Sequence, residues 1–194
     1  MVHGARLESV WVQARRGSNP LPSAMDYKQF LRAGKGASDI TPLLSNGVAF
    51  LNLIKDLARL FNNVTVDKVA GVEGRGFILG SPVAYEIKVG LIPIRTAGKL
   101  KNEVYSEKYI DYSGKEKYLE IHQDAIKPGE KILLIDDWLE TGATVKAAIK
   151  LIEKCEGIVS GIGVFMDDSS ETLREELKKY NYQYIAKVNY NDKF

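Results

Sequence analysis

The sequence predicts an α/β fold with a mostly parallel sheet flanked by helices. Two observations support this class. Short apolar segments, typical of buried strands, alternate with longer segments whose apolar residues recur at helical spacing. In addition, a length of 194 residues suits one domain with a substantial core and is too short for two domains of ordinary size.

The first half of the body contains a helix, a strand and a second helix in order. Residues 46–61 (NGVAFLNLIKDLARLF) place their large apolar residues on one helical face, and Asn46 is a candidate N-cap. Residues 66–72 (VDKVAGV) are typical of a buried strand that enters a glycine-rich turn. Residues 76–87 (GFILGSPVAYEI) then predict a helix on the far side of that turn.

The second half repeats the alternation around one exception. Residues 89–95, 131–137 and 157–168 predict strands, and a helix is expected to begin near Thr144. The exception is residues 97–118, which are rich in lysine, tyrosine and acids, with only a short apolar alternation. A connection of this length is usually a lid or a hairpin arm, so we expect residues 97–118 to form a mobile arm over the ligand site at the carboxyl ends of the strands. A solvated polar hairpin is the alternative.

The first 24 residues differ in composition from the rest. They contain three arginines, one glutamate and no lysine, whereas the remainder has nineteen lysines, five arginines and twenty-four acidic residues. We therefore expect residues 1–24 to be a leader or an expression-derived extension without ordered structure, with a transit peptide as the alternative. Residues 25–194 would then form the single domain.

Composition narrows the class of protein. The body is close to neutral, which gives no electrostatic footprint for nucleic acid or an anionic membrane. No apolar run has the length needed to cross a bilayer, so we expect the protein to bind neither nucleic acid nor a membrane. A single cysteine, Cys155, cannot form an intramolecular disulfide, which fits a cytoplasmic protein.

Residues 132–149 (ILLIDDWLETGATVKAAI) carry the clearest chemical signal. The apolar strand ends at Asp136 and Asp137, and the stretch Thr141–Thr144 can place backbone N–H groups around a phosphate at a helix N-terminus. Adjacent carboxylates repel a phosphate but suit sugar hydroxyls or a magnesium ion. A ribose 5-phosphate therefore satisfies both halves of the stretch. The alternative is a purely structural role, in which the two aspartates end a strand and Thr144 begins a helix.

This stretch resembles the phosphoribosyl pyrophosphate (PRPP) signature of type I phosphoribosyltransferases. The segments SDITPLL, GVEGRGF, PIRTAGKL and LEIHQDAIKPGEKILLIDD are similar to the adenine phosphoribosyltransferase branch of that family. The resemblance implies the type I phosphoribosyltransferase fold with a flexible arm and a small N-terminal hood. It also implies a homodimeric enzyme of purine salvage, which converts adenine and PRPP to AMP and pyrophosphate with magnesium held mainly by PRPP.

The resemblance also assigns roles to individual residues. The ribose and 5-phosphate of PRPP would be bound by Asp136, Asp137, Glu140, Thr141, Gly142, Ala143 and Thr144. The pyrophosphate would be bound by Glu73, Gly74, Arg75, Arg95 and Lys99. The catalytic residues would be Asp111, Arg75 and Lys99, and the base would lie against Ala37, Ser38 and Tyr112.

The arm departs from the family pattern. Relatives have Leu-Glu-Tyr-Gly, with a glutamate proposed to exchange a proton with the base, whereas this chain has Ile110-Asp111-Tyr112-Ser113-Gly114 and one extra residue. Trp138 stands where relatives usually have an aliphatic residue; it is expected in the core, with a position beside the base as the alternative. The altered arm leaves a PRPP-binding regulator without turnover as one alternative. A phosphoribosyltransferase for a 6-oxopurine is the other, because the sequence does not determine which edge of the base is bound.

Overall fold

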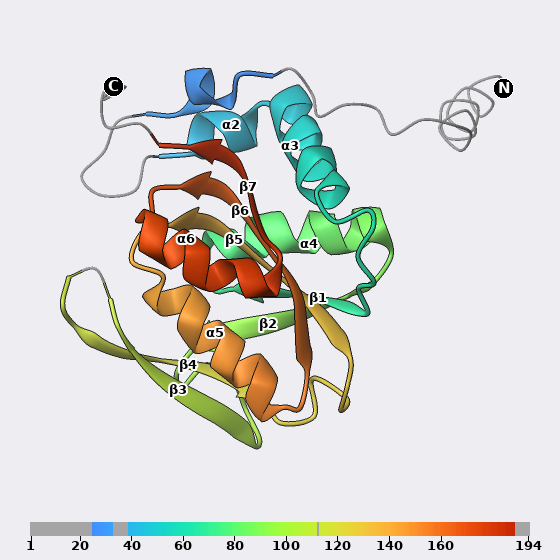
Figure 1. Cartoon of the computed structure of the whole chain (residues 1–194), viewed down its shortest axis with the longest axis vertical. Coiled ribbons are helices and arrows are strands. Elements are labelled where there is room, and N and C mark those ends of the chain that lie inside the picture. Colours follow the sequence, from blue (N-terminus) through green and yellow to red (C-terminus); the bar gives the residue numbers. More distant parts are fainter. Residues whose placement is uncertain (1–24, 33–38, 112, 189–194) are drawn as a thin grey trace, which may run out of the picture.

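The computed structural model describes residues 25–32, 39–111 and 113–188 (Figure 1). The expectations for residues 1–24, Ala37, Ser38 and Tyr112 lie outside these ranges. Within the described residues, no helix combines the length and the apolar character that a membrane span requires.

A seven-stranded sheet with the order β3-β4-β2-β1-β5-β6-β7 forms the centre of the structure. Neighbouring strands from β2 to β7 run parallel, whereas β3 and β4 form an antiparallel hairpin that pairs with the end of β2. The predicted class is therefore confirmed. The strands are β1 (Lys68–Val72), β2 (Gly90–Thr96), β3 (Val104–Ile110), β4 (Glu116–His122), β5 (Lys131–Leu139), β6 (Ile158–Asp167) and β7 (Tyr182–Lys187).

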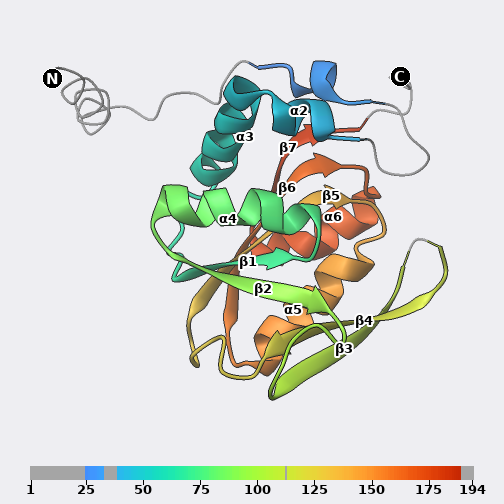
Figure 2. The ribbon, with the colours of Figure 1, turned by 180° about the vertical axis from the view of Figure 1, so that it is seen from behind.

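Helices cover both faces of the sheet (Figures 1 and 2). On one face lie α3 (Gly47–Arg59) and α4 (Arg75–Ile87), and on the other lie α5 (Ala143–Lys154) and α6 (Glu171–Leu177). Alternate residues of β5 point to opposite faces, so Leu133 packs towards α3 and α4 while Leu134 packs towards α5. Burial on both sides explains the continuous apolar run of this strand.

Most predicted elements are present with small changes of boundary. The helix expected at residues 46–61 is α3, and Asn46 caps it by accepting a hydrogen bond from the Ala49 N–H at 3.0 Å. The helix expected at residues 76–87 is α4. The pattern of residues 182–187 did not predict β7, an edge strand whose side chains are mostly exposed or half-buried and show little alternation.

A small hood precedes α3. It contains a 3₁₀ turn (Tyr27–Phe30), an isolated bridge between Arg32 and Asp39, and the short helix α2 (Thr41–Ser45). The buried Tyr27 hydroxyl donates to the Asp56 carboxylate at 2.6 Å, and its ring meets Phe165 of β6 edge-on at 5.9 Å. These contacts attach the hood to α3 and to the sheet.

The expected arm is an antiparallel hairpin of β3 and β4, which extends beyond the parallel strands of the sheet (Figure 2). The middle of β3 is attached to α5, because Glu107 forms ion pairs with Lys150 at 2.9 Å and Lys154 at 2.6 Å. Only two residue pairs, Arg95 with Glu120 and Thr96 with Leu119, join the hairpin to β2. Movement of the arm over the site stays a prediction.

Candidate active site

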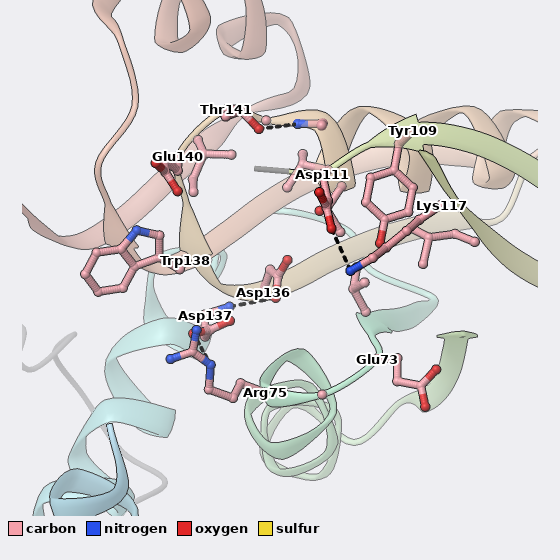
Figure 3. Close-up of a pocket in the computed structure, with 18 of the residues that line it drawn as sticks. Glu73, Arg75, Tyr109, Asp111, Lys117, Asp136, Asp137, Trp138, Glu140 and Thr141 are labelled. Atoms are coloured by element: carbon pink, nitrogen blue, oxygen red, sulfur yellow. Dashed lines mark hydrogen bonds and ion pairs between the residues drawn. The ribbon is translucent and has the colours of Figure 1, made fainter. Parts of the chain in front are cut away.

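A cleft of about 550 Å³ lies where β1, β2 and β5 end and α5 begins. The hairpin forms its remaining wall (Figure 3). This is the carboxyl edge of the parallel strands, where ligands bind in open α/β sheets. The cleft brings together the predicted residues Glu73, Gly74, Arg75, Asp111, Asp136, Asp137, Glu140, Thr141, Gly142, Ala143 and Thr144.

The two carboxylates at the end of β5 are almost completely buried. Asp136 and Asp137 are 8% and 6% exposed. The Asp137 N–H donates to Asp136 Oδ1 at 2.9 Å, and Asp137 Oδ2 lies 2.9 Å from Arg75 Nε. A close approach of α4 helps to enclose the pair, because a Cβ at Gly76 would lie 3.0 Å from Asp136 Oδ1.

Burial and mutual repulsion change the acidity of this pair. Burial, followed by the charge of Asp137, raises the pKa of Asp136 well above its usual value. Burial also raises the pKa of Asp137, against the opposing effect of Arg75. Carboxylates withdrawn from water in this way gain from any hydroxyl that donates a hydrogen bond to them. The geometry therefore suits a polyol such as a ribose.

The loop from Thr141 to Thr144 turns into α5 through Gly142. Gly142 has φ +74°, a conformation that favours glycine, and a Cβ there would lie 2.7 Å from Leu173 Cδ2. The Thr141 hydroxyl accepts from the Ala143 N–H at 3.3 Å. The next N–H groups belong to the first turn of α5, where intrahelical acceptors are lacking. The loop thus presents donors and a helix dipole to an anion.

Glu73 organises the cations expected to meet a pyrophosphate. Its Oε1 atom lies 2.7 Å from Lys99 Nζ and 3.2 Å from Arg95 Nη2, and its Oε2 atom accepts from the Thr96 N–H at 2.7 Å. Burial acts to raise the pKa of Glu73, but hydrogen bonds from Lys99, Thr96 and Arg95 outweigh it and lower that pKa to about 2. Glu73 is therefore ionised and holds both cations beside the cleft.

The neighbouring Gly74 has φ +99° and ψ −124°, a backbone conformation that L-residues rarely adopt. This turn places the start of α4 at the cleft and orients Arg75 towards Asp137. This loop therefore supplies one cation, Arg75, to the lining of the cleft. Arg95 and Lys99 do not line the cleft themselves, but Glu73 holds both beside it.

Asp111 closes the turn of the hairpin. Its Oδ1 atom accepts from the Ser113 hydroxyl at 2.7 Å and from the N–H groups of Ser113 and Lys115 at 2.8 and 3.0 Å. Its Oδ2 atom lies 2.7 Å from Lys117 Nζ. The hydrogen bond from Lys117 is the largest cause that lowers the pKa of Asp111 below its usual range. In this conformation Asp111 stabilises the turn, and proton exchange with a base requires release from Lys117.

Tyr109 and Lys117 also line the cleft, although neither was predicted as a site residue from the sequence. They face each other across the hairpin, and burial raises the pKa of the Tyr109 hydroxyl. The alternation of Lys117 with Leu119 and Ile121 could have indicated that Lys117 faces inward. Trp138, expected in the core, is half-buried, packs against the core beneath α3 and α4, and also lines the cleft.

Among the described residues, no group of three or more histidine, cysteine or acidic side chains is arranged to hold a metal ion. The adjacent carboxylates Asp136 and Asp137 nevertheless fit magnesium that arrives with a phosphate ligand, because such an ion needs only one or two protein carboxylates.

Comparisons with known proteins agree with the geometry. A family model described as "Phosphoribosyl transferase domain" matches residues 43–192. The chain is 42% identical over 151 residues to an adenine phosphoribosyltransferase of Leuconostoc citreum, covering 77% of this chain and 85% of that protein. It is 43% identical over 157 residues to an adenine phosphoribosyltransferase of Halothermothrix orenii, covering 80% and 91%.

The fold is also similar to that of a solved structure. The crystal structure of an adenine phosphoribosyltransferase from Thermoanaerobacter pseudethanolicus superposes with a TM-score of 0.76 at 34% identity, covering 84% of this chain and 98% of that chain.

Proposed function

The chain belongs to the phosphoribosyl transferase family, and we propose that it transfers the 5-phosphoribosyl group of PRPP to adenine, which yields AMP and pyrophosphate. The observation that carries this function is the joint presence in one cleft of a buried carboxylate pair and an anion-binding loop at the start of α5. Relatives that are 42% and 43% identical are adenine phosphoribosyltransferases, which supports adenine over a 6-oxopurine.

The carboxylate pair and the loop have complementary tasks. Asp136 and Asp137 accept hydrogen bonds from the ribose hydroxyls, while Thr141, Gly142, Ala143 and Thr144 donate to the 5-phosphate, with Glu140 at the rim. Since these groups lie at opposite ends of one strand-to-helix turn, they fix the ribose at two points. Such a clamp holds the anomeric carbon in place for attack by the base.

The pyrophosphate is bound at the side of the cleft formed by Glu73, Gly74 and Arg75. Departure of pyrophosphate leaves a ribose with oxocarbenium character, so rate enhancement comes from stabilising the charge that develops on the leaving group. Arg75 faces the cleft, and Glu73 keeps Arg95 and Lys99 beside it. Magnesium held mainly by PRPP would neutralise further charge on the pyrophosphate.

Asp111 is the arm's candidate for proton exchange with the base, with Ala37, Ser38 and Tyr112 as the proposed wall of the base subsite. A carboxylate in this region supports the reaction because a purine nitrogen attacks more readily when a proton elsewhere on the ring is held or transferred. Asp111 lines the cleft, as this role requires.

We also propose that the enzyme is a cytoplasmic homodimer. The single cysteine, Cys155, is buried and has no disulfide partner, which agrees with a reducing compartment. Sedimentation at several protein concentrations tests the dimer, and a monomer at all concentrations would contradict it.

Steady-state release of pyrophosphate with adenine, hypoxanthine, guanine or xanthine tests the function. We expect turnover with adenine, abolished by a chelator and restored by magnesium. Activity only with a 6-oxopurine would assign the chain to a different branch of the family. Binding of PRPP without turnover on any base would identify a regulator.

A further inference from the structure

The inner face of the hairpin runs from the core into the cleft. Leu119 and Ile121 of β4 are buried in the core beneath α5, and Tyr105 and Tyr109 of β3 pack against the same core. Lys117 is two residues from Leu119 on β4, pairs with Tyr109 across the hairpin, and lines the cleft. Because side chains alternate along a strand, Lys117 continues the inward-facing row beyond the core.

The lining of the cleft is poor in cations for a site that binds a polyphosphate. The described residues of that lining include five carboxylates, Glu73, Asp111, Asp136, Asp137 and Glu140, but only two cations, Arg75 and Lys117. Arg75 is paired with buried Asp137 at 2.9 Å. Lys117 is therefore the cationic side chain that the hairpin adds to the cleft.

The surroundings of Lys117 allow it to leave Asp111. Its side chain is 45% exposed, and the lysine stem is flexible. Asp111 would keep hydrogen bonds from Ser113 and Lys115 after Lys117 moves, so the carboxylate would not lose all its donors. Exchange of one anionic partner for another therefore costs little free energy, and a pyrophosphate group, which carries more than one negative charge, competes well with one carboxylate.

We propose that Lys117 is a substrate-binding residue of the arm that exchanges its ion pair with Asp111 for one with the pyrophosphate group of PRPP. The pyrophosphate side is favoured because Leu119, two residues along β4, pairs with Thr96, whose N–H binds Glu73. Lys117 thereby adds a cation on the side of the cleft where Glu73 holds Arg95 and Lys99 behind the lining. This assignment rests on the proposed function, under which pyrophosphate is the leaving group.

Calorimetric titration with PRPP and with AMP in the presence of magnesium tests the contact, since AMP has the 5-phosphate but no pyrophosphate. We expect Lys117→Gln to raise the Kd for PRPP by roughly 10- to 100-fold, the usual effect of losing a hydrogen bond to a charged group. The Kd for AMP should change by less than about threefold, as for a distant surface charge. Equal weakening of both ligands would contradict a pyrophosphate contact.

Lys108→Gln is the matched control. Lys108 lies on the same hairpin and forms an ion pair with Glu116 at 3.1 Å, but it does not line the cleft. This variant removes the same charge from the same element, so we expect the Kd for PRPP to stay within about threefold of the parent. A loss as large as that of Lys117→Gln would show a general field effect and overturn the assignment.

The double variant Asp111→Asn/Lys117→Gln distinguishes two roles of Lys117: direct contact with PRPP, and neutralisation of the negative charge of Asp111. If Lys117 binds pyrophosphate, the double variant binds PRPP as weakly as Lys117→Gln. Recovery of parental affinity would show that Lys117 only screens Asp111, and would overturn the proposal while leaving the enzymatic function intact. A parent that binds neither PRPP nor AMP would overturn both.

Discussion

Asp137→Asn probes the ribose contact with the smallest change of shape. The substitution replaces a carboxylate that is 6% exposed and paired with Arg75 by an amide of nearly equal size. It converts a charge-assisted acceptor of a ribose hydroxyl into a neutral one, a change of about 1.5–2 kcal/mol. That free energy corresponds to a Kd for PRPP raised by roughly 10- to 30-fold.

The fold should tolerate this change. Burial raises the pKa of Asp137, so its ionised form is costly inside the protein and the neutral amide avoids that cost. Arg75, whose side chain is 34% exposed, can turn towards water when its partner is removed. These effects oppose each other, so we expect the free energy of unfolding to change by about 1 kcal/mol or less.

The assay is calorimetric titration with PRPP, accompanied by thermal unfolding. Asp67→Asn is the matched control, because Asp67 accepts a hydrogen bond from the Lys131 N–H at 2.7 Å, at the opposite end of β5 from the cleft. The control should bind PRPP like the parent. Unchanged affinity in Asp137→Asn, with its fold intact, would refute the assignment of this carboxylate to the ribose.

Further variants test the loop, the arm and the leader. Thr144→Ala should raise the Kd for PRPP by about tenfold through loss of a phosphate donor, measured by titration; parental affinity would place the 5-phosphate elsewhere. Glu107→Gln should speed hydrogen exchange across residues 97–117, because it weakens the ion pairs to α5. PRPP together with adenine should slow that exchange, and equal exchange rates in all states would contradict a moving arm. Asp111→Asn should lower kcat with adenine by roughly 100-fold without weakening PRPP binding; an unchanged kcat would show that binding geometry alone supports turnover. Deletion of residues 1–24 should leave kcat/KM intact, and a large loss would reveal a functional element there.

The β5–α5 unit was predictable because its signals are local. An apolar run buried on both faces, two acids at its end and a Thr-Gly-Ala-Thr turn occupy one continuous stretch, and each property follows from neighbouring residues. The structure places the two acids and the turn in the cleft. Asn46 is a similar case, since an N-cap depends on residues only three positions apart.

Contacts between residues far apart in the chain were not predictable from the local sequence pattern. The pairing of Glu73 with Lys99 joins residues 26 positions apart and depends on the turn at Gly74. The inward position of Lys117 depends on the register of the hairpin, which the polar composition of residues 97–118 conceals. β7 was missed because an edge strand with mostly exposed side chains has little alternation.

AMP formation from adenine and PRPP, with pyrophosphate measured in the same reaction, tests the central claim most directly. The parent should form one AMP for each pyrophosphate released, and Asp137→Asn should need a higher PRPP concentration for the same rate. A parent that releases pyrophosphate only with a 6-oxopurine would contradict the adenine assignment. Equal PRPP dependence in parent and variant would contradict the placement of the ribose at the end of β5.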